Sequence, residues 1–97
     1  MATIDQRVAR GAQLLDREGP TGWREQIECD TLDLSDCKQC ILGQLYGDYE
    51  PGLYKLRVYD GTPQGFERAN TDTPTPIASA KRQYARLTAA WRRELDC

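Results

Sequence analysis

The four cysteines are the residues of this chain best suited to metal binding or redox chemistry, and two of them form a CxxC motif at Cys37 and Cys40. The surrounding pattern predicts a helix over residues 36–46, which places the motif at a helix N-terminus, where the dipole lowers the pKa of a thiol. Dithiol oxidoreductases use that arrangement beside a strand–helix–strand pattern, which is missing here. Helix positions i and i+3 both face the core, where cysteine packs as a small hydrophobic residue. We therefore expect Cys37 and Cys40 to be reduced and metal-free, with Cys40 buried and Cys37 partly buried.

A metal site is the alternative use of these cysteines. Cys29, Cys37 and Cys40 have the spacing C-x7-C-x2-C, and Cys97 would supply a fourth thiolate if the C-terminus folded back. Structural zinc commonly takes two close cysteine pairs, whereas this chain has one pair, and Cys97 is a terminal residue, where chains fray. The main prediction is therefore no metal and no cofactor. The alternative is a zinc-binding or thiol-based regulator that uses Cys29, Cys37 and Cys40.

The N-terminal sequence sets the expected redox state of the thiols. MATIDQRVARG lacks the apolar core of a signal peptide, and no apolar run approaches the roughly 20 residues of a membrane span. We therefore expect a cytoplasmic protein with free thiols and no membrane partner. Alkylation of the native protein is then predicted to modify Cys97 first, Cys37 next and Cys40 last.

Other catalytic chemistry has little support in the sequence. The chain has no histidine, which excludes histidine bases, His-based triads and Cys/His metal sites. Its densest carboxylates, between Asp30 and Glu50, are typical of caps and turns, and no spacing pairs two of them beside a nucleophile. A glycine-rich phosphate loop is also missing. We predict no enzymatic activity and no catalytic residues.

Charge and tyrosine content instead predict a binding surface. Residues 25–50 carry seven acidic residues and one basic residue, whereas residues 77–97 carry five basic and two acidic ones. Such segments either face each other or steer a partner. A pI of about 5.1 and the small basic footprint argue against nucleic acid as the partner. Tyrosine suits binding surfaces, although it also fills thin cores. The candidate partner-binding residues are Tyr49, Tyr59, Arg82, Arg86 and Arg93.

These residues must be positioned by one small domain, because 97 residues leave room for a single core. Leu, Ile, Val and Phe total seventeen residues, just under the roughly 20 % that is typical of folding chains. The net charge of only −2, the two Trp and the five Tyr nevertheless favour a folded domain with a thin core. Apolar residues recur at helical spacing in four segments, 4–18, 36–46, 51–58 and 77–95.

The predicted fold is a single mainly α domain over residues 1–97, with three to four helices. Residues 31–34 alternate between apolar and polar, as in a brief strand or an extended approach to a helix, and 65–67 is a second short extended segment. These allow at most a two-stranded β element, which leaves an α+β fold possible. The last helix should pack through Tyr84, Leu87 and Trp91 on the helices that contain Leu15 and Leu45. The Pro/Thr-rich loop 71–76 should be the most mobile internal part.

Several polar and glycine positions refine this prediction. Thr3 is a good N-cap for the first helix, and Gly19-Pro20 is expected to end it. Gly11 and Gly43 interrupt predicted helices, which indicates close packing of a neighbour at each. Gln44 lies near an inward face, so we expect its side chain to bond backbone groups.

The chain contains, in this order, the segments Gly11–Asp16, Gly22-Trp23 with Ile27, Leu32–Leu34, Cys40–Gly47, Gly65-Phe66 and Tyr84–Trp91. This order of segments resembles a family of small uncharacterised proteins encoded by bacteriophages and prophages of actinobacteria. The resemblance covers residues 11 to about 95, and its most specific parts are CILGQLYG and YARLTAAW. The family has no established activity, so the resemblance implies an origin and an intracellular location but no catalytic residues.

The resulting functional prediction is a non-enzymatic phage or prophage protein that binds a host or phage protein. Its location would be the cytoplasm of the infected or lysogenic host. The alternatives are the cysteine-based regulator and, less favoured, nucleic-acid binding through the basic C-terminal helix.

Overall fold

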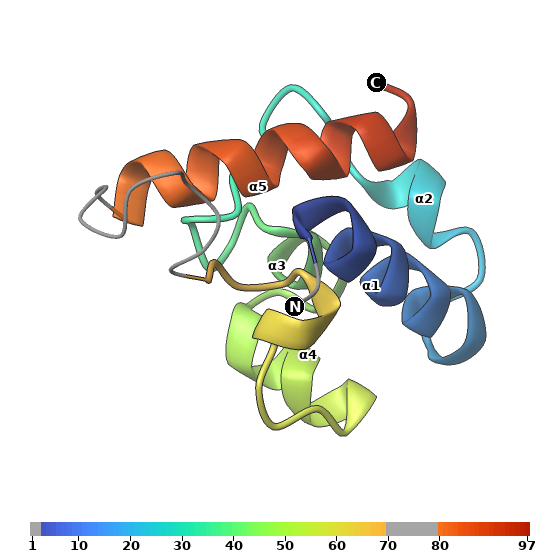
Figure 1. Ribbon diagram of the computed structural model, residues 1–97. Coiled ribbons are helices and arrows are strands. Elements are labelled where there is room, and N and C mark those ends of the chain that lie inside the picture. The colour runs from blue at the N-terminus through green and yellow to red at the C-terminus, as the bar shows by residue number, and fades with distance from the viewer. Residues whose placement is uncertain (1–2, 70–79) are drawn as a thin grey trace.

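The computed structural model describes residues 3–69 and 80–97. Within those ranges the chain forms five α-helices and one 3-10 turn, with no strand. The shorter elements are α2 (Trp23–Gln26), α3 (Ile41–Tyr46) and η1 (Thr62–Gln64). Figure 1 shows α5 (Ala80–Leu95) along one side, α4 (Tyr49–Leu56) on the opposite side and α1 (Ile4–Glu18) between them. The predicted mainly α class is confirmed, and the predicted loop 71–76 lies outside the described residues.

The first helix has the predicted limits and caps. The Thr3 hydroxyl accepts a hydrogen bond from the Gln6 N–H (3.1 Å), and the Gln6 side chain accepts one from the Thr3 N–H (2.9 Å). This capping box satisfies two donors that the first turn leaves unpaired. At the other end, Gly19 has extended backbone angles and is followed by Pro20, which cannot continue the helix.

The core is centred on Trp91, whose side chain has no exposed surface. Its ring stacks on Phe66, with centroids 5.9 Å apart, and meets the edge of Trp23 at 6.3 Å. The indole N–H donates to the carbonyl of Gly65 (2.6 Å). These contacts join α5, α2 and the turn after η1, which explains how a sequence poor in aliphatic residues forms a core.

The packing of α5 confirms the prediction only in part. Leu87 and Trp91 are buried and Tyr84 is half-buried, but Ala80 is exposed, because α5 begins beyond the core (Figure 1). A polar residue, Gln83, is buried in the first turns instead and accepts a hydrogen bond from Arg68 (2.8 Å). The helix packs on α1 as predicted, whereas α3 packs mainly on α4 and α2.

Gly11 confirms the expectation of a close neighbour. A Cβ at this position would overlap the carbonyl oxygen of Gln64 and lie 3.0 Å from Cζ2 of Trp91. Replacement of Gly11 by alanine should therefore lower the free energy of unfolding by about 1–3 kcal/mol, the usual cost of overpacking, although alanine is the better helix former.

Urea unfolding of the Gly11→Ala variant measures this effect. Gln13→Ala is a matched control, because Gln13 is an exposed residue of the same helix. A Gly11→Ala variant as stable as the parent would contradict the close packing of α1 against η1.

The second predicted helix begins five residues later than expected. Residues 33–40 form consecutive turns in which aspartate side chains bond nearby backbone N–H groups. The Asp33 carboxylate accepts from the Ser35 N–H (3.0 Å), and that of Asp36 accepts from the Lys38 N–H (2.8 Å). Such local bonds compete with helix formation, so α3 starts only at Ile41, with Cys40 as its N-cap. Its end at Gly47, with φ of 90°, is as predicted.

Neither predicted extended segment is a strand in the described residues. Leu32 and Leu34 are buried as the alternation suggests, but the Leu34 N–H donates to the Thr88 hydroxyl of α5 (3.0 Å) and not to a neighbouring strand. At 65–67 the chain turns, because Gly65 adopts φ of 72°. In each segment a tertiary contact takes the place of strand pairing.

The helix predicted over 51–58 is α4, which begins two residues earlier. Asp48 caps it by accepting from the Tyr49 N–H (2.7 Å), so Pro51 falls within the first turn, where a missing N–H costs nothing. The helix ends at Leu56, because Arg57 has left-handed backbone angles (φ 58°). None of the described helices is long and apolar enough to span a membrane.

Candidate functional site

The structure pairs two of the four cysteines in a disulfide between Cys29 and Cys97. The prediction of four free thiols, with Cys97 frayed and alkylated first, is therefore wrong. The reason is tertiary: α5 carries the C-terminus to the loop after α2, and Arg92 donates to the carbonyls of Cys29 and Leu32, both at 3.2 Å. The Cα atoms of the two cysteines are 6.3 Å apart, within the range that disulfides require.

The CxxC motif is divided between the surface and the core. Cys37 is exposed in a turn, not partly buried in a helix as predicted, whereas Cys40 is buried as predicted. The Cys40 sulfur accepts from the Gly43 N–H (3.2 Å), and burial raises the pKa of this thiol to about 11. The close packing expected at Gly43 is present, because a Cβ there would overlap the carbonyl oxygen of Cys37. Cys40 is thus a core residue and a helix cap.

The cysteine geometry also bears on the zinc alternative. The described residues contain no group of three or more Cys, Asp or Glu side chains placed to hold a metal ion. With Cys29 bonded to Cys97, only the Cys37 and Cys40 sulfurs are thiols. A zinc site on these residues would first require reduction of the disulfide.

Alkylation of the native protein tests this cysteine assignment. With iodoacetamide at pH 8, Cys37 should react first, and Cys40 should react at least about tenfold more slowly, because it is buried and roughly one thiol in a thousand is ionised at that pH. Cys29 and Cys97 should remain unmodified until a reductant is added. Peptide mass spectrometry measures each rate. Early modification of Cys97 without reductant would contradict the disulfide.

The sequence-predicted binding residues do not form one surface. Arg82, Arg86 and Arg93 lie on α5. Tyr49 is the first residue of α4 and Tyr59 follows the end of that helix, which lies on the opposite side of the molecule (Figure 1). The arginines also differ among themselves. Arg93 donates to the Asp5 carboxylate (3.0 Å) and Arg82 takes part in another interaction, whereas Arg86 is exposed with no polar partner among the described residues.

Tyr49 is not the exposed residue that the sequence predicted. Its ring is half-buried against the core, and its hydroxyl packs against Gly61. That hydroxyl is buried with no hydrogen-bond partner in the described part of the chain. Burial, with the nearby Glu67 carboxylate, raises the pKa of Tyr49 above its ordinary value. Tyr49 therefore belongs to the structure of the domain and leaves the set of candidate contact residues.

Tyr59 is exposed as predicted, and Tyr54, which sequence reasoning missed, joins it. Their relative exposures are 105 % and 86 %, the highest of the large hydrophobic residues described. The position of Tyr54 off the apolar stripe of α4, next to Leu53 and two residues before Leu56, is the signal that could have found it.

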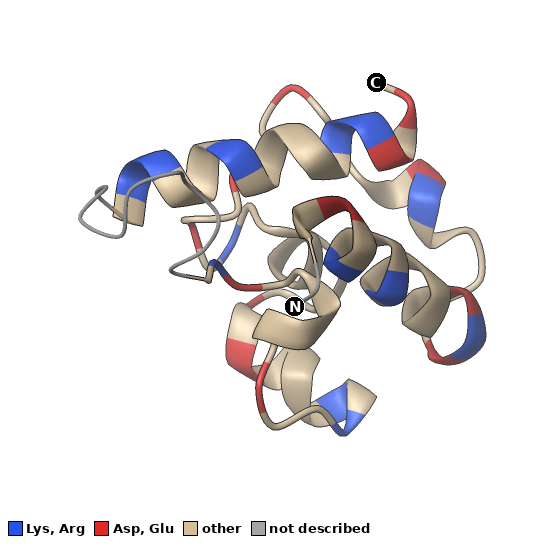
Figure 2. Ribbon diagram, in the orientation of Figure 1, with Lys and Arg blue, Asp and Glu red and all other residues tan. Residues whose placement is uncertain are grey.

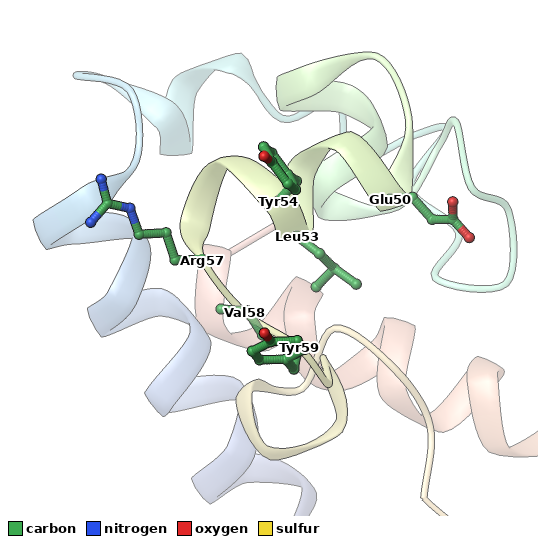
Figure 3. A pocket seen from close by; sticks show the side chains of 6 residues that line it. All are labelled: Glu50, Leu53, Tyr54, Arg57, Val58 and Tyr59. Carbon is green, nitrogen blue, oxygen red and sulfur yellow. The ribbon is translucent and has the colours of Figure 1, made fainter.

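The two tyrosines border a hollow of about 780 Å³, which we call the tyrosine hollow. Figure 3 shows Tyr54 and Tyr59 with Leu53 and Val58 between them, while Glu50 and Arg57 lie on opposite sides. The lining residues are Glu50, Leu53, Tyr54, Arg57, Val58 and Tyr59. All of them come from α4 or the three residues after it, so one helix and its left-handed end position the whole site.

Glutamine 44 behaves as predicted. Its side-chain oxygen accepts from the Glu28 N–H (2.6 Å), and its amide nitrogen donates to the carbonyls of Glu28 (3.2 Å) and Gln39 (3.1 Å). The side chain thus fastens the loop after α2 to α3. Gln44 is therefore a structural residue within the acidic stretch 25–50.

No family model, curated protein or solved structure matches the chain. The resemblance to phage and prophage proteins therefore stays a prediction.

Proposed function

We propose that this protein is a non-enzymatic binding protein that recognises another protein through the tyrosine hollow. The observation that carries the proposal is the pair of exposed tyrosines, Tyr54 and Tyr59, beside a single hollow at the end of α4. Tyrosine contributes large apolar area, a polar tip and few rotatable bonds, which is why it is enriched among the residues that dominate binding energy.

The rest of the aromatic residues support this assignment. Trp23, Phe66 and Trp91 are buried in the core, and Tyr46, Tyr49 and Tyr84 pack against it partly buried. Two tyrosines left in solvent do not add to folding stability through burial. Their role is better explained by a partner that buries them.

The origin and location of the partner follow from the sequence resemblance. A phage or prophage protein would meet a phage or host protein in the cytoplasm of the host. The cysteine-based regulator remains the alternative, and it would need Cys29 to be released from Cys97. The proposal for the tyrosine hollow assigns no catalytic role and no cofactor to any residue.

Affinity capture with matched variants tests the proposal. Tagged parent protein and a Tyr54→Ser/Tyr59→Ser variant are incubated with host extract, and bound proteins are quantified by mass spectrometry. We expect at least one protein to be captured by the parent and lost from the variant. The purified partner should then bind the variant at least about tenfold more weakly, because a residue that dominates an interface contributes about 2 kcal/mol or more.

An Arg86→Ala variant serves as the comparison on α5, the surface favoured by the sequence. Partners that bind the tyrosine variant and the parent equally strongly, but do not bind Arg86→Ala, would place the site on α5 and contradict the proposal. Sedimentation of the free protein adds a further outcome: self-association that the tyrosine variant abolishes would make the partner a second copy of this chain.

A further inference from the structure

Beside the tyrosine hollow lie two smaller hollows with a basic lining. One, of about 450 Å³, lies between α1 and the end of α4 and contains Arg17, Lys55 and Arg57. The other, of about 330 Å³, lies between α1 and η1 and contains Arg10 and Arg17. We call Arg10, Arg17, Lys55 and Arg57 the basic track. The positive charge comes from two helices that are distant in sequence, so it is a property of the tertiary structure.

The cations of the basic track have no carboxylate partners among the described residues. All four residues are exposed, and none of the four side chains forms an ion pair or hydrogen bond in the described part of the chain. Several other basic residues do have carboxylate partners: Arg24 contacts Asp16 (3.5 Å) and Glu94 (3.3 Å), Lys38 contacts Asp48 (3.0 Å), and Arg93 contacts Asp5 (3.0 Å). Lys81 and Arg86 of α5 are also exposed with no such partner in the described part of the chain, but the basic track gathers four such cations from α1 and the end of α4 around two hollows.

Shared residues connect the basic track to the tyrosine hollow. Arg57 lines both the tyrosine hollow and the 450 Å³ hollow, and Arg17 lines both basic hollows. Figure 3 shows the Arg57 side chain extending away from Tyr59 toward α1. Figure 2 shows basic residues along α1 and at the end of α4, and the 450 Å³ hollow that Arg17, Lys55 and Arg57 line joins these two parts of the chain. The three hollows therefore form one continuous surface.

Helix dipoles explain only part of this charge. Arg17 and Lys55 lie in the last turns of α1 and α4, where a cation interacts favourably with the negative end of the helix. Arg10 lies in the middle of α1, so the dipole does not explain it. One carboxylate, Glu18, lines the 450 Å³ hollow. The local balance remains strongly positive.

We propose that the partner presents an extended acidic segment to this surface. An apolar side chain of the segment occupies the tyrosine hollow, and successive Asp or Glu residues follow the basic track past Arg57 and Arg17 to Arg10. The inference rests on the proposed function, since it specifies what the tyrosine hollow binds. Glu50, on the side of the hollow away from Arg57, repels acidic residues and so fixes the direction of the segment.

A protein segment fits this surface better than a nucleic acid. The basic track is short, and the chain as a whole carries a net charge of −2, which repels a long polyanion. An apolar anchor beside a run of carboxylates uses both the tyrosines and the cations. A nucleic-acid backbone would engage the cations but leave the aliphatic part of the hollow, Leu53 and Val58, without an apolar partner.

Selection from a random peptide library tests the inference. Peptides of about 12 residues are suitable, because an extended chain of that length spans roughly 40 Å and the longest dimension of the molecule is 37 Å. Selection is run on the parent, on Tyr54→Ser/Tyr59→Ser, on Arg17→Glu/Arg57→Glu and on Lys81→Glu/Arg86→Glu. The last variant reverses two exposed cations of α5 and so changes the net charge by the same amount. Thermal melting checks that each variant is folded.

We expect selected peptides with an aromatic or aliphatic residue on one side of an acidic run. Their affinity should fall about tenfold or more in Arg17→Glu/Arg57→Glu and in the tyrosine variant, and several-fold when salt is raised from about 50 mM to about 300 mM. Glu50→Lys should increase the acidic content of peptides selected next to the anchor on the Glu50 side.

Other results would overturn the inference, and they separate it from the proposed function. Peptides that need the tyrosines but show no acidic enrichment would keep the tyrosine hollow as the binding site and reject a role for the basic track in binding. Peptides lost only in Lys81→Glu/Arg86→Glu would place recognition on α5 and contradict both proposals. Binding of a mixed-sequence single-stranded oligonucleotide that is lost in Arg17→Glu/Arg57→Glu would replace the acidic segment by nucleic acid. If selection yields no peptide on the parent or on any variant, the extended acidic segment is rejected. The proposed function would then still be tested by affinity capture.

Discussion

Replacement of Trp91 by alanine should leave this domain largely unfolded near 37 °C. Trp91 has no exposed surface, stacks on Phe66, meets the edge of Trp23 and donates its indole N–H to Gly65. Truncating a buried Trp costs about 3–5 kcal/mol, and a domain of this size with a thin core has about 5–8 kcal/mol in total. Circular dichroism melting should show a transition that is broadened and shifted below physiological temperature.

Two variants separate ring packing from the hydrogen bond. Trp91→Phe keeps an aromatic ring but leaves the Gly65 carbonyl without its donor, so it should lose less stability than Trp91→Ala. Tyr59→Ala removes a fully exposed ring and should melt within a few degrees of the parent. A Trp91→Ala variant that melts as the parent does would show that Trp91 does not organise the core.

Loss of the Cys29–Cys97 disulfide should lower the free energy of unfolding by about 4 kcal/mol. The bond closes a loop between residues 68 apart in the sequence, and a crosslink over that length removes much of the freedom of the unfolded chain. Urea unfolding of Cys29→Ser/Cys97→Ser, or of the parent with a reductant, measures the effect. Cys37→Ser is the control, because Cys37 is an exposed free thiol.

The state of this disulfide also bears on where the protein works. Disulfides persist mainly in oxidising compartments, whereas the sequence predicts the cytoplasm. Rapid alkylation of thiols in intact host cells shows which state exists there. If Cys29 and Cys97 are found as thiols, the domain functions in the cell with the lower free energy of unfolding that it has without the disulfide. Equal stability of the double serine variant and the parent would show that the disulfide contributes little, and that the Arg92 contacts hold the C-terminus.

Helix caps, helix ends and buried helix faces could be predicted from the sequence wherever residues close together in the chain determine the structure. Thr3 caps α1, Gly47 ends α3, and the apolar spacing of α1 and α5 buries Leu15, Leu87 and Trp91. Each of these depends on residues within about one helical turn of one another, so spacing alone predicts it. The mainly α class followed from the same patterns.

Competition between local bonds explains the main local error. Residues 36–40 have a helical apolar pattern, yet the Asp33 and Asp36 side chains bond backbone N–H groups and hold this stretch in turns. Helical spacing and aspartate turns predict different structures for the same residues. The apolar pattern does not decide between them, because Leu34 and Cys40 are buried in the turn conformation as well.

The functional surface depended on contacts between distant parts of the chain. The sequence by itself determined that the tyrosines and basic residues are the candidates for binding, and that histidine chemistry is excluded. Only the tertiary structure decided that Tyr49 turns toward the core while Tyr54 and Tyr59 remain exposed, and that Cys97 reaches Cys29. It also brought Arg17 of α1 beside Arg57 after α4, forty positions later in the sequence. The physical reason is that side-chain exposure and the proximity of remote charges are set by how the helices pack, which is not encoded in the spacing of any one helix.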